Sequence, residues 1–81
     1  MQAAFLELKQ GDKYVADYDL EFNRLAKFSP IFVSTKELKT EHFIAGLRED
    51  IRGYVASQAS TDYTVTLKMA TLIDMPRMDK L

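Results

Sequence analysis

The stretch QGDKYVADYDLEFNRLAKFSP, residues 10–30, decides the fold of this chain. Its large apolar side chains recur at intervals of three, four and three residues, at Val15, Tyr18, Phe22 and Leu25. This spacing places all of them on one side of an α-helix. We therefore predict a helix from about Lys13 to Phe28 that packs on a core through this side.

Turn signals bound this helix at both ends. Gly11 and Asp12 form a turn before it, and Asp12 stands where its carboxylate can act as the N-cap. Pro30 disfavours helical backbone in the residue before it, so the helix must have ended by Ser29. Upstream of the turn, the apolar residues predict a short helix of two turns from Ala3 to Lys9.

The next predicted helix begins with a capping-box pattern, in which Ser34 is followed three residues later by Glu37. The serine oxygen and the glutamate carboxylate of such a box each accept a hydrogen bond from a free backbone N–H at the helix start. Phe43, Ile44 and Leu47 continue the buried side of this helix.

Gly46 lies inside the same predicted helix, where a glycine costs about 0.5–1 kcal/mol relative to alanine. Its presence indicates that another backbone segment approaches closely at this position. After a bend at residues 48–50, Ile51, Tyr54 and Val55 mark a short fourth helix.

The last segment allows two interpretations. A helix from about Asp62 to Asp74, capped by Thr61 or Asp62, is predicted by apolar residues at helical spacing, namely Tyr63, Leu67, Ala70 and Ile73. The β-branched residues and the alternation from Tyr63 to Leu67 instead fit a partly extended segment. The run MPRM, residues 75–78, is expected to end the helix and to open a frayed tail over residues 75–81.

Size and composition indicate one helical domain. The 81 residues are 47% hydrophobic and 28% charged, which is typical of a single folded domain spanning residues 1–81. With the helical patterns, this predicts an all-α fold, a small bundle of four to five short helices. A chain of this size without disulfides or metals often depends on oligomerisation, which favours self-association.

The residue inventory argues against several functions. With no Cys and one His, a disulfide framework, a zinc knuckle and a thiol nucleophile are excluded, and no cofactor is expected. The 11 basic residues are dispersed and matched by 12 acidic ones, so no direct nucleic-acid binding is expected. The chain has neither a long apolar run nor a signal peptide, so we expect an intracellular protein with no membrane partner.

Candidate catalytic groups are few, and we predict that the chain is not an enzyme. His42, the single histidine, fits a structural imidazole better than a general base. Asp17 and Glu21 are one helical turn apart, and no apolar pocket is indicated around them, so they are interpreted as a solvated face. The three glycines are too far apart to form one phosphate-binding loop.

One ordered set of residues extends over most of the chain: Phe5, Leu8, Gln10-Gly11, Val15, Tyr18, Phe22, Leu25, Ser29-Pro30, Phe43, Gly46-Leu47, Ile51 and Val55. In residue type and spacing this set resembles the Gag domain of Gypsy-type (Metaviridae) LTR retrotransposons. Residues 10–25 are similar, in turn, to the major homology region of retroviral capsid proteins, a Gln-Gly turn followed by an amphipathic helix. The resemblance covers roughly residues 5–73.

The resemblance implies a fold and a role. The fold is the C-terminal lobe of the capsid part of Gag, with its first, tryptophan-containing helix missing. The role is to build the shell of a cytoplasmic virus-like particle through helix-mediated dimerisation. The implied partners are further copies of this chain, as homodimer or higher oligomer, and other Gag capsid lobes. The zinc knuckle and basic tail that capture RNA in the neighbouring nucleocapsid part are absent here.

Two positions of the major-homology-like segment carry specific expectations. Gln10 is expected to cap or brace the helix that follows it. The retroviral region has an arginine just before its helix phenylalanine, whereas Glu21 precedes Phe22 here. The hydrogen-bond network of that arginine is therefore not expected in this chain.

Three alternatives to an assembly module stay open. A domesticated Gag-derived adaptor would hold a peptide or protein partner in a helical groove, and a solitary gene without protease and polymerase frames would indicate it. The apolar stripes alone also fit a monomeric core. An enzyme would be indicated by a turnover that the change His42→Ala abolishes.

Overall fold

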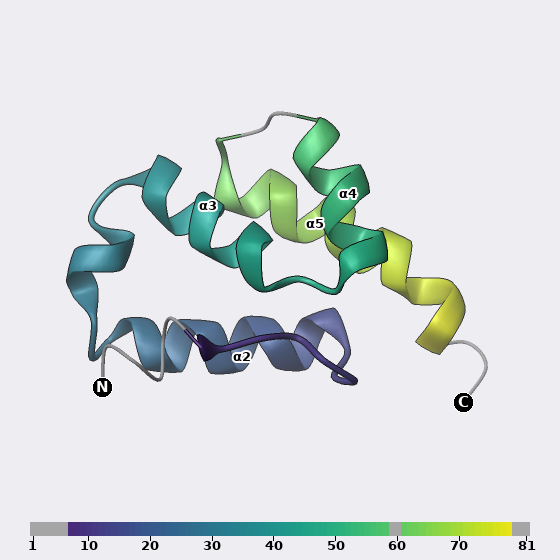
Figure 1. The fold of residues 1–81 in the computed structure, drawn as a ribbon, viewed down its shortest axis with the longest axis horizontal. Helices are drawn as coiled ribbons and strands as arrows, with labels where there is room; N and C mark the ends of the chain where they lie inside the picture. Colours follow the sequence, from purple (N-terminus) through teal and green to yellow (C-terminus); the bar gives the residue numbers. More distant parts are fainter. Residues whose placement is uncertain (1–6, 59–60, 79–81) are drawn as a thin grey trace.

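The computed structural model describes residues 7–58 and 61–78, and the regular elements among them are all helices. They are α2 (Val15–Ala26), the 3₁₀ helix η1 (Pro30–Val33), α3 (Lys36–Gly46), α4 (Glu49–Ser57) and α5 (Tyr63–Met78), shown in Figure 1. The predicted small all-α bundle is confirmed, and the last segment is a helix, not a strand. Within these described ranges, no helix has both the length and the apolar character needed to cross a membrane.

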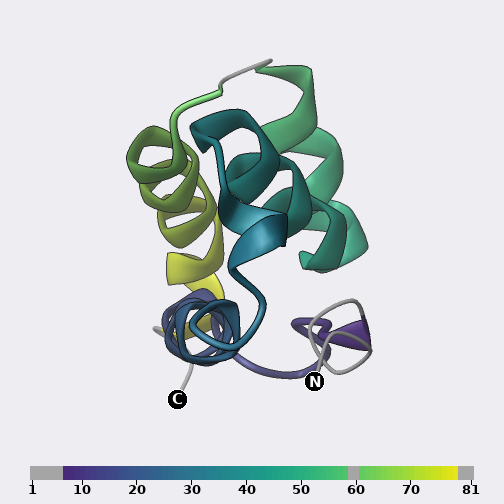
Figure 2. The ribbon, with the colours of Figure 1, turned by 90° about the vertical axis from the view of Figure 1, so that its left-hand side faces the viewer.

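The helices stand on one another in two levels. α2 runs along one edge of the molecule, and α3, α4 and α5 stand above it in Figure 1. Figure 2 shows α3 between α5 on one side and α4 on the other. α5 packs against α2, α3 and α4, so it connects the two levels. The turn of residues 8–14 passes beside α2 and beneath α4.

The core lies between these two levels. On α2, Val15, Tyr18 and Phe22 are buried, which confirms the prediction, whereas Leu25 is only half-buried. The other helices contribute the buried residues Phe43, Gly46, Leu47, Ile51, Val55 and Ala70. Four rings pack together with centroids 4.9–6.1 Å apart, those of Tyr18, Phe22, Phe43 and Tyr63. Pairs at such distances add about 0.5–1.5 kcal/mol each beyond the burial of their surface.

The predicted N-cap of α2 is wrong. Residues 10–13 form a turn of their own, in which the Lys13 N–H donates to Gln10 O at 2.9 Å. The helix therefore starts later than expected, with Tyr14 as N-cap, whose side chain does not cap the helix. Asp12 is exposed in the turn and lies too early in the chain to cap it.

The predicted capping box of α3 is also wrong. η1 ends at Val33, and Ser34 keeps helical backbone (φ −69°, ψ −22°), which an N-cap residue does not have. Thr35 is the N-cap instead, with extended backbone, and its Oγ1 accepts a hydrogen bond from Leu38 N at 3.0 Å. Glu37 is thereby one position too early for the capping-box contact, and its side chain is exposed.

The outermost predicted segments differ from the structure in two ways. Of the predicted helix Ala3–Lys9, residues 3–6 lie outside the described residues, Glu7 is helical, and Leu8 and Lys9 are not. At the other end, α5 continues to Met78 through the predicted stop at residues 75–78. Pro76 lacks an N–H, but this removes a single backbone bond in the last turn of a 16-residue helix. Residues 79–81 of the predicted tail lie outside the described residues.

Candidate functional site

The turn before α2 is attached to the rest of the molecule through Gln10. Its side chain is fully buried, with Oε1 accepting from Arg48 N at 2.8 Å and Nε2 donating to Lys13 O at 2.9 Å. Its backbone N–H donates to Gly46 O at 2.7 Å. Gly11 follows with a φ of 56°, which glycine adopts without strain. Gln10 therefore braces the turn that leads into α2 and also joins it to the α3–α4 junction.

Gly46, near this brace, is a point of close approach, as the sequence indicated. A Cβ atom placed on it would lie 2.9 Å from the backbone oxygen of Leu8 and would overlap the Tyr18 hydroxyl. That hydroxyl donates to Phe43 O at 2.9 Å. Burial raises the pKa of Tyr18, so the phenol stays protonated and keeps donating.

A buried carboxylate on α5 takes the capping role predicted for Asp12. Asp74 is 1% exposed, and its Oδ2 accepts a hydrogen bond from Val15 N at 2.9 Å, at the start of α2. Its Oδ1 lies 3.6 Å from Nη2 of Arg48. Negative charge is favourable at a helix N-terminus, and this contact binds α5 to α2 across 59 residues of sequence. The clue in the sequence was that Asp74 is the single acidic residue of the stretch 63–78.

Arg48 connects the two preceding contacts. Its backbone N–H is bound by Gln10, and its guanidinium approaches Asp74. The guanidinium also donates to Asp50, Nε to Oδ1 at 2.8 Å and Nη2 to Oδ2 at 3.2 Å. These hydrogen bonds raise the pKa of Arg48 and lower the pKa of Asp50. The Asp50 side chain is 66% exposed, so its pair with Arg48 contributes little stability. We call Gln10, Arg48 and Asp74 the polar clamp.

A second polar contact joins α2 to the start of α5. The Tyr63 hydroxyl donates to Asp19 Oδ1, and Asn23 Nδ2 donates to Tyr63 Oη at 3.1 Å. Burial first, and then the bond to Asp19, raise the pKa of Tyr63, so its phenol stays protonated. Nζ of Lys39 lies 4.3 Å from the centroid of the Tyr63 ring, a cation–π contact from α3.

The predicted site residues fall into two groups. The structure brings Gln10 and Gly46 together beside Tyr18, with Gly11 in the exposed turn after Gln10 and Val15 held by Asp74. The predicted helix-cap residues, Ser34 and Glu37, are exposed at the N-terminal end of α3, away from this group. His42 packs edge-on against Phe32 with ring centroids 5.3 Å apart, as expected of a structural imidazole. Among residues 7–58 and 61–78, no three His, Cys, Asp or Glu side chains are grouped to hold a metal ion.

The side chains of α5 are distributed around its axis in a way that is unusual for a surface helix. Its most buried side chains are Thr66, Ala70 and Asp74, which are small or polar. Large apolar side chains on its outer side are exposed, Val65 by 47%, Leu72 by 59% and Met75 by 45%. Val65 and Leu72 are two helical turns apart and so lie above each other on that side. We call Val65, Leu72 and Met75 the α5 stripe.

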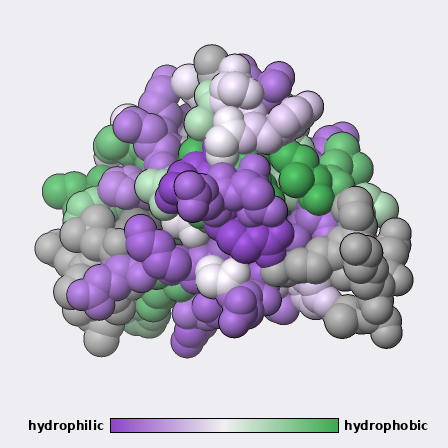
Figure 3. Space-filling model, turned by 45° about the vertical axis from the view of Figure 1, so that its right-hand side comes forward, coloured by the Kyte–Doolittle hydropathy of each residue, from purple (hydrophilic) through white to green (hydrophobic). Residues whose placement is uncertain are grey.

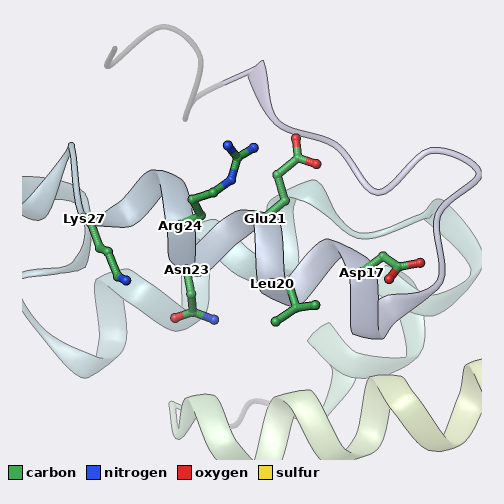
Figure 4. Close-up of a pocket in the computed structure, with 6 residues that line it drawn as sticks. All are labelled: Asp17, Leu20, Glu21, Asn23, Arg24 and Lys27. Carbon is green, nitrogen blue, oxygen red and sulfur yellow. The ribbon is translucent and has the colours of Figure 1, made fainter.

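Other exposed apolar groups lie around the molecule. Phe28 and Ile31 are 63% and 65% exposed where α2 leads into η1. The face of the molecule in Figure 3 has a hydrophilic centre, with apolar groups toward both edges. A shallow hollow follows the outer side of α2 (Figure 4), lined by Asp17, Leu20, Glu21, Asn23, Arg24 and Lys27. Five of the lining residues belong to α2 and the sixth, Lys27, is its C-cap, so the hollow is open surface and not an enclosed pocket.

Comparison with family models, curated proteins and solved structures finds no match to this chain.

Proposed function

We propose that this chain is a structural self-association module that assembles through its helices and performs no catalysis. The observation that carries the proposal is the α5 stripe. A surface helix of a monomer normally turns its apolar side to the core and its polar side to water. α5 buries Thr66 and Asp74 while Leu72 stays exposed, so the outer side of this helix has apolar surface for another molecule to cover.

The resemblance to Gag adds support for the type of assembly. The residues that carry it include Gln10, Tyr18, Phe22, Phe43 and Gly46, which are all buried and in contact with one another or with the polar clamp. On this proposal the chain is the C-terminal lobe of a retrotransposon capsid, and its partners are other copies and other Gag capsid lobes. It works in the cytoplasm, within a virus-like particle, and leaves RNA capture to other parts of the polyprotein.

The dependence of thermal unfolding on protein concentration tests this proposal. Association that is specific to the folded state stabilises it by mass action, which makes the melting temperature rise with concentration. We expect the melting temperature, followed by circular dichroism, to rise steadily when the chain is concentrated about a hundredfold through the micromolar range. A constant melting temperature would contradict self-association.

A further inference from the structure

We propose that the outer side of α2 is a two-fold contact with a second copy of this chain, in which the two α2 helices pack antiparallel. This inference rests on the proposed self-association and adds which surface is used and how the copies are oriented. The α5 stripe does not indicate which partner covers it. Its side of the helix has one charged side chain within residues 63–75, Lys68, so it has no charge pattern that a partner could complement. The side chains of α2 carry more information.

The outer side of α2 is divided by charge. Asp17 and Glu21 stand toward its N-terminal end, and Arg24 and Lys27 toward its C-terminal end (Figure 4). Leu20 lies between the two groups and is 70% exposed, the most exposed of the large apolar side chains among residues 7–58 and 61–75. The acidic and basic halves therefore flank one apolar side chain on a single helix.

The four charged groups are available for an outside partner. Asp17, Arg24 and Lys27 are exposed, and Glu21 is partly exposed. None of them forms an ion pair with another residue of the described part of the chain. A contact on this side therefore has no internal ion pair to break.

This pattern is complementary to itself in one orientation only. In a two-fold contact the same surface of both copies meets, with residue i against j and j against i. A two-fold axis beside Leu20 and Glu21 places Asp17 opposite Arg24 of the partner subunit, and the reverse contact follows by symmetry. These two residues lie about 10 Å apart along the helix, at 1.5 Å per residue. A parallel pair would instead place like charges opposite each other, which is strongly unfavourable.

The apolar side chain and the charged side chains have different roles in this contact. The two Leu20 side chains meet near the axis and remove apolar surface from water. The charges add little affinity at an exposed site, but they select the antiparallel orientation and exclude others. Because exposed ion pairs are screened by salt, the contact weakens as ionic strength rises.

Exchanging the charges between two variants tests the proposal. One variant carries Asp17→Lys and Glu21→Lys, so its α2 surface is basic throughout, and the other carries Arg24→Glu and Lys27→Glu, so that surface is acidic throughout. We expect each variant alone to associate at least about tenfold more weakly than the natural chain. An equimolar mixture should associate again, as heterodimers, because the basic surface then faces the acidic one.

The control is a variant with Glu37→Lys and Glu41→Lys on α3, which has the same spacing and the same change of net charge on exposed residues. It should associate like the natural chain. Sedimentation equilibrium measures all five samples, namely the natural chain, the two α2 variants, their mixture and the control, and circular dichroism verifies that each variant is folded. If the natural chain and both α2 variants associate equally, or if the control fails like the first variant, the α2 contact is wrong while self-association stands. A natural chain that stays monomeric would contradict both proposals.

Discussion

Two glycines inside helices differ in the space around them, since Gly46 is crowded and Gly53 is open. Alanine at each position tests this difference. A Cβ atom at Gly46 would meet Leu8 O and the Tyr18 hydroxyl, whereas a Cβ atom at Gly53 on α4 would have nothing within 4 Å. We expect Gly46→Ala to destabilise the chain by about 1–3 kcal/mol, because backbone must move to make room. Gly53→Ala should stabilise it by about 0.5–1 kcal/mol through helix propensity. Urea unfolding measures both, and equal effects would contradict the close approach at Gly46.

The N-terminus of α2 is stabilised by a carboxylate from a distant helix, and mutation of that carboxylate tests this contact. Asp74→Ala removes the acceptor of Val15 N and the buried partner of Arg48, so we expect a loss of about 1–3 kcal/mol in the free energy of unfolding. Asp12→Ala is the matched control, since that carboxylate is exposed, and it should change stability by less than about 0.5 kcal/mol. A larger effect at Asp12 than at Asp74, in the same urea titration, would restore the local cap predicted from the sequence.

The same elements separate what sequence could predict from what it could not. The buried side of α2 was predictable because a 3.6-residue period places Val15, Tyr18 and Phe22 together without knowledge of any other segment. Gly46 could be singled out because a helix tolerates glycine poorly, although the sequence did not identify Leu8 as the neighbour. Cap prediction considers the residues next to a helix, so it selected Asp12 and missed Asp74, 59 residues from Val15. Ser34 was selected because Glu37 follows it at the capping-box spacing, but no sequence signal indicated η1, at whose C-terminal end Ser34 has helical backbone.

At the scale of the whole molecule, the fold is a helical bundle whose stabilising contacts join distant segments. The polar clamp connects the turn before α2, the α3–α4 junction and α5, and the four-ring cluster joins α2, α3 and the start of α5. A chain of 81 residues without Cys has a small core, so association is a physically reasonable source of added stability. The α5 stripe and the divided charges of α2 are the surfaces through which we expect it.

Sedimentation equilibrium of the natural chain measures self-association directly. The mass of one chain is 9.3 kDa. We predict that the weight-average mass rises with concentration through the micromolar range toward at least twice the mass of the chain, and that added salt shifts this rise to higher concentration. A mass of one chain at every concentration would contradict the account.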